Sequence, residues 1–124
     1  MSTKPIFVEK NTGEKISVEV SGNTVILNEE MMLNLSKYER DYDVHIDICK
    51  NSFGMLTFGV SDRYAVEIDI PARAYDYIDD GEDAEGKPKT KKVAKPFDMS
   101  NVTVTLWGLE VNEEQEQTGG ENNE

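Results

Sequence analysis

Two segments of the chain carry most of the side chains that could do acid–base or metal chemistry. Tyr42–Ile48 (YDVHIDI) and Tyr64–Ile70 (YAVEIDI) both alternate apolar and polar residues, as strands with one buried face do. Their polar faces carry one imidazole and four carboxylates, namely those of Asp43, His45, Asp47, Glu67 and Asp69. If the two strands paired directly, these groups would lie close enough together to bind a divalent cation or to act as general acid and base.

The expected order of the strands argues against such a site. Met55–Val60 (MLTFGV) lies between the two segments in the sequence, and it also reads as a strand. In a simple meander it would hold the two polar faces about 10 Å apart, which is two strand spacings. We therefore expect a solvated polar face here, and binding of a cation to it stays open.

Other signatures of catalysis or of a cofactor are missing from the sequence. His45 is the only histidine and Cys49 the only cysteine, which excludes a His–His zinc pair and an intramolecular disulfide. There is no GxGxxG, P-loop, HExxH or GxSxG motif. Asp79–Gly86 (DDGEDAEG) has its first glycine at the third position, whereas the calcium loop of an EF-hand needs glycine at the sixth. We expect a protein that is not an enzyme and that has no cofactor and no metal.

The net charge is strongly negative and is concentrated at one end. The chain has a charge of −12 and a pI near 4.4, which argues against direct binding to nucleic acid or to an anionic membrane. Glu110–Glu124 contains six acids and no base, so half of the net charge lies there. Because this stretch is almost devoid of apolar residues, we predict a single β-rich domain over 1–111 and a disordered acidic tail over 112–124.

A second charged block is neutral overall. Asp79–Gly86 carries five acids, and Lys87–Lys95 (KPKTKKVAK) carries five lysines. Opposite charges on either side of a glycine- and proline-containing turn predict a hairpin whose two limbs attract each other. Tyr75 and Tyr77 directly precede it, and aromatic side chains beside patterned charge are typical of protein-recognition surfaces. The alternative, that both tyrosines belong to the core, stays open. The candidate partner-binding residues are Tyr75, Tyr77, Asp79, Asp80, Glu82, Asp83, Lys89, Lys91 and Lys92.

The pattern of the whole chain predicts a mainly β fold. Further strands are expected at Lys4–Glu9, Lys15–Val20, Thr24–Leu27, Ala72–Ile78 and Val102–Leu109, with the loop NTGE joining the first two as a hairpin. Seven to eight short strands with frequent turns favour a small antiparallel β-sandwich or barrel. Trp107, in the last strand, is expected to be buried in its core.

One short helix is expected over residues 29–38. Asn28 suits an N-cap, and Leu27, Met31, Leu35 and Tyr38 follow the spacing of one helix face.

These features favour a protein that works by binding. The N-terminus has no apolar run of signal-peptide length, and no segment approaches 18 apolar residues. We expect no membrane association, a cytoplasmic or virion-associated location, and no secretion through a signal peptide. The expected function is a non-enzymatic protein-binding or assembly domain, such as a small accessory or structural protein of a virus or mobile element. Its partner would be another protein, or further copies in a homo-oligomer.

The alternative is an acidic inhibitor that mimics nucleic acid and blocks a basic groove on another protein. Such a mimic needs rows of acids on a rigid surface, whereas here many acids lie in the predicted tail or beside lysines.

Overall fold

The structure is a computed structural model, and it describes residues 4–109. This part of the chain is mainly β, as predicted. Its strands are β1 (Ile6–Glu9), β2 (Val18–Ser21), β3 (Thr24–Leu27), β4 (Met31–Asn34), β5 (Val44–Lys50), β6 (Leu56–Phe58), β7 (Arg63–Ile70), β8 (Tyr75–Glu82), β9 (Pro88–Ala94) and β10 (Thr103–Leu106). Two short 3₁₀ helices, η1 (Leu35–Tyr38) and η2 (Met99–Asn101), complete it. The predicted tail over 112–124, and the predicted end of the domain at 111, lie outside the described residues.

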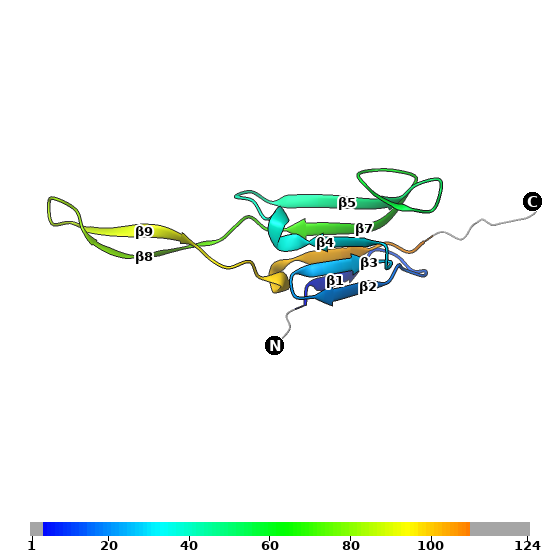
Figure 1. Ribbon diagram of the computed structural model, residues 1–124, viewed down its shortest axis with the longest axis horizontal. Coiled ribbons are helices and arrows are strands. Elements are labelled where there is room, and N and C mark those ends of the chain that lie inside the picture. The colour runs from blue at the N-terminus through cyan, green and yellow to red at the C-terminus, as the bar shows by residue number, and fades with distance from the viewer. Residues whose placement is uncertain (1–3, 110–124) are drawn as a thin grey trace, which may run out of the picture.

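The strands form three separate sheets (Figure 1). One has five strands in the order β1-β10-β7-β5-β6, one has the order β2-β3-β4, and β8 pairs with β9 alone. The five-stranded sheet ends at two open edges, β1 and β6, so residues 4–109 contain no closed barrel and that alternative is wrong. These residues form ten strands rather than seven or eight. Neither 3₁₀ helix has the length and apolar character needed to cross a bilayer.

The two larger sheets bury their apolar faces in one common cluster. Leu27 and Leu33 come from the three-stranded sheet, and Ile48, Ile68 and Val104 come from the five-stranded sheet. Because side chains alternate along a strand, burying these residues directs the intervening polar residues of the same strands to the opposite face. The core therefore decides which face of each sheet meets solvent.

The two ends of the described chain lie side by side in this fold. β1 pairs in parallel with β10, and the Ile6 backbone N–H donates to the Val102 carbonyl at 2.8 Å. Farther along, the Leu109 N–H donates to the Glu14 carbonyl at 2.7 Å. The predicted hairpin between residues 4–9 and 15–20 is therefore wrong, because β1 pairs with β10 and β2 pairs with β3.

The predicted helix over 29–38 is also wrong. Asn28 and Glu29 have φ angles of 55° and 58°, and the Glu30 N–H donates to the Leu27 carbonyl, which makes a tight turn of three residues between β3 and β4. Leu27 and Met31 are cross-strand partners on either side of this turn, and both of them, like Leu35 at the start of η1, pack in or against the core. Their spacing of four residues therefore does not mark a helix face. Only Leu35–Tyr38 is helical, as a single 3₁₀ turn.

The charged block forms the hairpin that the sequence predicts. Strands β8 and β9 pair only with each other within the described chain, and they project from the rest of the molecule (Figure 1). At the turn, the Asp83 carboxylate accepts hydrogen bonds from the N–H groups of Glu85 and Lys87, at 2.8 and 2.9 Å. We call residues 75–94 the arm, and the two larger sheets with their connections the body.

Candidate functional site

All nine candidate partner-binding residues lie on the arm. Tyr75, Tyr77, Asp79, Asp80 and Glu82 belong to β8, Asp83 begins the turn, and Lys89, Lys91 and Lys92 belong to β9. The hairpin therefore brings together residues that are up to 17 positions apart in the sequence. What a partner would meet depends on how this arm is held and on which side chains it exposes.

The root of the arm is fastened to the body by polar contacts. The Tyr75 hydroxyl donates to Asp41 Oδ1 at 2.5 Å, and Arg73 Nη1 reaches the same oxygen at 3.2 Å. The hydrogen bond from Tyr75 is the main cause that lowers the pKa of Asp41, so this carboxylate stays ionised. The ammonium of Lys92 lies 4.1 Å from the centre of the Tyr75 ring, a cation–π contact. Tyr75 is thus an anchoring residue rather than a free surface aromatic.

Asp41 and Arg73 were missed in the sequence. Arg73 also donates to the Glu39 carbonyl at 3.0 Å, and its backbone N–H donates to the Arg40 carbonyl at 2.7 Å. These contacts join segments that are more than 30 positions apart, and no local pattern predicts them.

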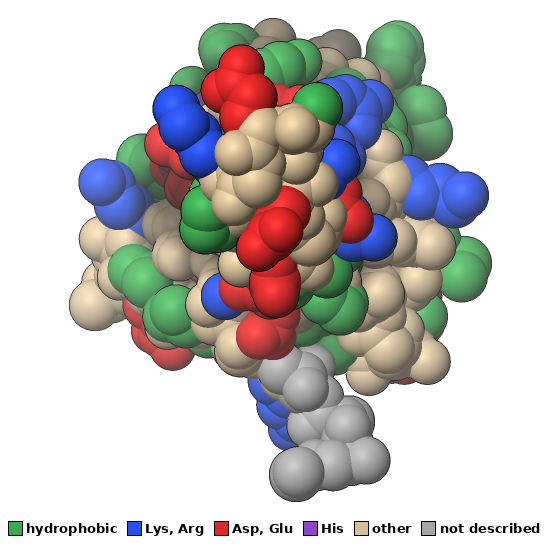
Figure 2. Space-filling view, turned by 90° about the vertical axis from the view of Figure 1, so that its left-hand side faces the viewer, with side chains coloured by type: hydrophobic (Ala, Val, Ile, Leu, Met, Phe, Trp, Pro, Cys, Tyr) green, Lys and Arg blue, Asp and Glu red, His purple; other side chains and the backbone are tan. Residues whose placement is uncertain are grey.

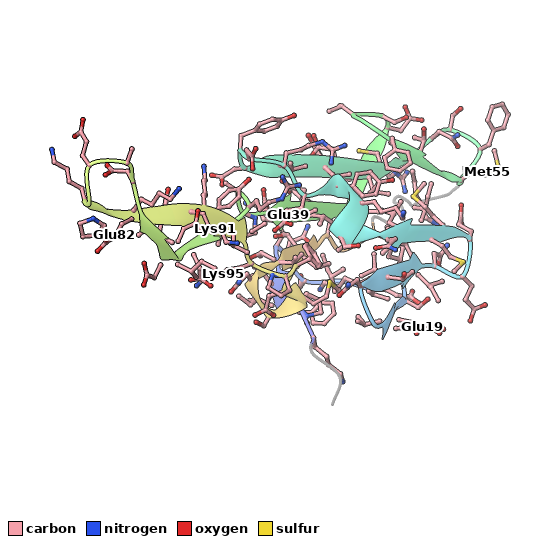
Figure 3. The ribbon with its side chains drawn as sticks, turned by 60° about the vertical axis from the view of Figure 1, so that its left-hand side comes forward. Glu19, Glu39, Met55, Glu82, Lys91 and Lys95 are labelled. Atoms are coloured by element: carbon pink, nitrogen blue, oxygen red, sulfur yellow. The ribbon has the colours of Figure 1, made fainter. Side chains whose placement is uncertain are left out.

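The charges of the arm are sorted by strand. β8 contains four acids and no base, and β9 contains three lysines and no acid. Figure 3 shows Glu82 and Lys91 on the projecting arm, with Lys95 and Glu39 near its root. Figure 2, which faces this end of the molecule, shows acidic and basic side chains gathered close together. One edge of the ribbon is acidic and the other is basic.

The arm also exposes apolar side chains. Tyr77 is 68% exposed, Ile78 44% and Val93 39%. Tyr77 lies opposite Lys92 on one face, while Ile78 and Val93 belong to the other face. Because a two-stranded ribbon buries little of its own surface, it is at most marginally stable alone in water. Both faces of the arm therefore gain from being covered.

A depression of about 380 Å³ lies where the arm joins the body. Its lining includes Pro71, Ala74, Pro96 and Phe97, together with the carboxylate-bearing Glu39. Such a mixed, mainly apolar lining is able to receive a side chain from a partner that also contacts the arm.

The polar groups of Tyr42–Ile48 and Tyr64–Ile70, which the expected strand order held apart, do lie together. β5 pairs directly with β7, because β6 lies on the far side of β5, so the expected separation by an intervening strand is wrong. His45 lies opposite Asp69, and Asp47 lies opposite Glu67. Asp43 stays apart, since its Oδ1 accepts a hydrogen bond from the Ala72 backbone N–H at 2.9 Å.

The geometry of this cluster indicates a protonated imidazole. His45 Nδ1 lies 2.6 Å from Asp69 Oδ1, and Nε2 lies 2.7 Å from Asp47 Oδ1 and 3.5 Å from Glu67 Oε1. An ionised carboxylate only accepts hydrogen bonds, so both contacts are hydrogen bonds at the same time only when both ring nitrogens carry hydrogen. The hydrogen bond to Asp69, followed by that to Asp47, raises the pKa of His45, against an opposing effect of partial burial.

This arrangement limits what the cluster can do chemically. Ligand atoms of His45, Asp47 and Glu67 lie within 4.8 Å of one another, as a cation site would require. A doubly protonated imidazole has no lone pair for a metal, however, so a cation would first have to displace a proton. The cluster as it stands is a partly exposed network of ion pairs on the outer face of the sheet.

Trp107 borders the cluster instead of lying in the core. Its indole N–H donates to Glu67 Oε2 at 2.5 Å, and its ring stacks on that of Tyr64 with centroids 5.0 Å apart. Glu67 lies on the face opposite the core residues Val66 and Ile68, so Trp107 is half-buried on the outer face. The prediction of a core tryptophan is wrong, because the alternation of β10 directs Val104 inward and Trp107 outward.

We expect His45→Gln to lower stability in a pH-dependent way. Because the pKa of His45 is raised in the folded protein, its contribution is complete below its ordinary pKa of about 6.5 and is lost as the pH rises through the folded value. The groups are partly exposed, so the contribution should be about 0.2–1 kcal/mol. In urea unfolding at about pH 6 and about pH 9, the free energy of unfolding of the wild type should exceed that of the variant mainly at the lower pH. If the difference in free energy of unfolding between the wild type and the variant grew with pH, it would contradict the ion-pair network.

The comparisons with known proteins do not assign a family. No family model, no curated protein and no solved structure matches this chain.

Proposed function

We propose that this chain is a non-enzymatic protein-binding or assembly domain, in which a small β-sandwich body presents the arm to a protein partner. The observation that supports this most is the arm itself. It is a ribbon whose side chains are almost all exposed, with charges sorted by strand and a root fastened to the body through Asp41 and Tyr75. A fastened but uncovered ribbon combines a fixed position with a large surface that a partner can bury.

The composition of the arm suits protein recognition. Aromatic anchors surrounded by charged groups are common at protein interfaces, and Tyr77 provides such an anchor between Asp79 and Lys92. Charge patterning of this kind contributes specificity and steers association more than it adds affinity. A small accessory or structural protein of a virus or mobile element is the kind of protein that we propose.

We regard the outer face with His45 as structural. Both of its ring nitrogens are engaged by carboxylates, and the contacts of Trp107 and Tyr64 are those of a packed surface. General acid–base work needs a ring nitrogen that can reach a substrate. This supports the proposal of a binding protein over that of an enzyme.

Shortening the arm should weaken partner binding by about tenfold or more, roughly 1.4 kcal/mol. The variant replaces residues 78–91 by Asn-Gly, which turns the chain directly from Tyr77 to Lys92 and keeps the root contacts of Tyr75. The probe is protein extract from the native source, passed over immobilised wild-type chain or variant, with the retained proteins quantified by mass spectrometry. Urea unfolding of the variant checks that the body is intact.

Salt separates this proposal from the acidic inhibitor. Binding through the arm should fall only modestly between low and physiological salt, because the charged block 79–95 is neutral overall. If the amount of retained partner protein fell steeply with salt and did not change when the arm was shortened, the result would support a nucleic-acid mimic instead.

A further inference from the structure

We propose that the partner of the arm is a second copy of this chain, which adds its own arm edge to edge. In this pairing β8 of one copy lies beside β9 of the next, and one antiparallel sheet runs through successive arms. The inference rests on the proposed function, since it names the partner of the same surface. Three features of the arm lead to it: its open edges, the sorting of its charges, and its exposed apolar side chains.

Each strand of the arm leaves one edge unpaired within the described residues. β8 and β9 are eight and seven residues long and pair with each other, and neither pairs with another strand there. Such edges are templates for further strands, and proteins usually block them with bulges, proline or charge. Here the irregular pairing and Pro88 lie near the turn, whereas Tyr75–Asp79 pairs with Thr90–Ala94 in an unbroken register. The half of the ribbon nearest the body therefore contains neither a bulge nor a proline, and the charges that it carries are acids on β8 and lysines on β9.

The charges select which edges can meet. Two β8 strands side by side would place acids against acids, and two β9 strands would place lysines against lysines, which is unfavourable in both cases. Only β8 beside β9 of another copy brings opposite charges together. Since β8 and β9 run in opposite directions, copies that point the same way then form an antiparallel sheet without reversing any chain.

The apolar side chains gain from the same arrangement. Tyr77 on one face, and Ile78 and Val93 on the other, would each lie next to side chains of the neighbouring arm. Backbone hydrogen bonds and this burial would provide affinity, and the sorted charges would provide register and direction.

The symmetry of the assembly follows from the pairing. A contact between two different edges is head to tail, so it repeats from copy to copy and closes into a ring or continues as a filament. A two-fold dimer would need identical edges to meet, which the charges oppose. The structure therefore assigns to the arm an assembly with more than two copies.

The test uses charge reversal on one edge at a time in the full chain. Asp80 and Glu82 on β8, and Lys89 and Lys91 on β9, make no ion pair or side-chain hydrogen bond among the described residues, so their replacement disturbs no contact of the body. The variants are D80K/E82K, K89E/K91E and the combination of all four changes. The control E19K/K37E exchanges charges at two exposed positions of the body, and Figure 3 shows Glu19 far from the arm.

Sedimentation velocity over a wide range of protein concentration should show larger assemblies for the wild type and for the body control. Each one-sided variant should associate at least about tenfold more weakly, and mixing the two should restore assembly because the reversed edges complement each other. The variant with all four changes has opposite charges on its two strands, as the wild type does, so it should assemble with itself. It should not assemble with the wild type, because like charges would then meet. Hydrogen exchange should report additional protection in residues 75–79 of the assembled samples, at the amides that do not already donate to β9 of the same copy.

Several results would overturn the pairing. The wild type could stay monomeric at every concentration or stop at a two-fold dimer. The one-sided variants could assemble as strongly as the wild type. The variant with all four changes could assemble freely with the wild type. If the wild type is monomeric but still retains another protein through its arm, the proposed function stands and the self-pairing fails. If neither self-association nor arm-dependent retention is observed, both proposals fail.

Discussion

Ile68→Ala should lower the free energy of unfolding by about 2–5 kcal/mol, the usual cost of truncating a large, fully buried aliphatic side chain. Ile68 has no exposed surface and lies on β7, the middle strand of the five-stranded sheet. Its neighbours in register are Val104 on β10 and Ile46 on β5, which also belong to the core. Truncation therefore removes apolar contact at a point where three strands meet, and the surrounding backbone cannot collapse into the gap.

A matched control is available in the same sheet. Ile6 lies on the edge strand β1 and is 52% exposed, so Ile6→Ala should cost about 1 kcal/mol or less. Urea unfolding followed by circular dichroism measures both variants. If Ile68→Ala and Ile6→Ala lowered the free energy of unfolding equally, β7 would not be the centre of the core.

Gly108→Ala should also destabilise the body, by about 1–3 kcal/mol, the typical cost of overpacking. A Cβ atom at Gly108 would overlap the carbonyl oxygen of Thr12 and would lie 2.9 Å from its carbonyl carbon. Both are backbone atoms, so a rotation of side chains cannot relieve the overlap. The Gly108 N–H also donates to Asn11 Oδ1, so a shift of either segment would strain this hydrogen bond.

Gly22→Ala separates this overlap from effects of backbone conformation. Gly22 has a φ of 60°, and a Cβ atom added there would meet no other atom within 4 Å. Alanine at this position should therefore cost only the strain of the left-handed region, about 1 kcal/mol. In thermal and urea unfolding, the Gly108→Ala variant should be less stable than the Gly22→Ala variant. A Gly108→Ala variant as stable as the wild type would show that residues 107–109 do not pack against residues 11–14.

Much of the candidate site was predictable because it depends on local sequence. A hairpin over 79–95 follows from opposite charges around a turn, and seven of the nine candidate residues lie within these bounds. The structure extends the hairpin back to Tyr75, which adds Tyr75 and Tyr77. How the arm is held was not predictable, because Asp41 and Tyr75 are 34 positions apart and meet only when the body has folded. A contact between single polar side chains at that separation leaves no pattern in the sequence.

The sequence by itself determined the mainly β class, most strand positions and the core-facing residues of β5 and β7, since alternation with a period of two is written locally in each segment. It did not decide between helix and strand around Met31 and Leu35, because a spacing of four residues satisfies both periods. The tertiary structure decided which strands pair: β5 with β7, which assembles the cluster around His45, and β1 with β10, which joins the two ends of the described chain. Pairing of distant strands depends on the burial of the apolar faces of the two larger sheets in one shared core. The free energy of this burial is a property of the whole fold and not of any single segment.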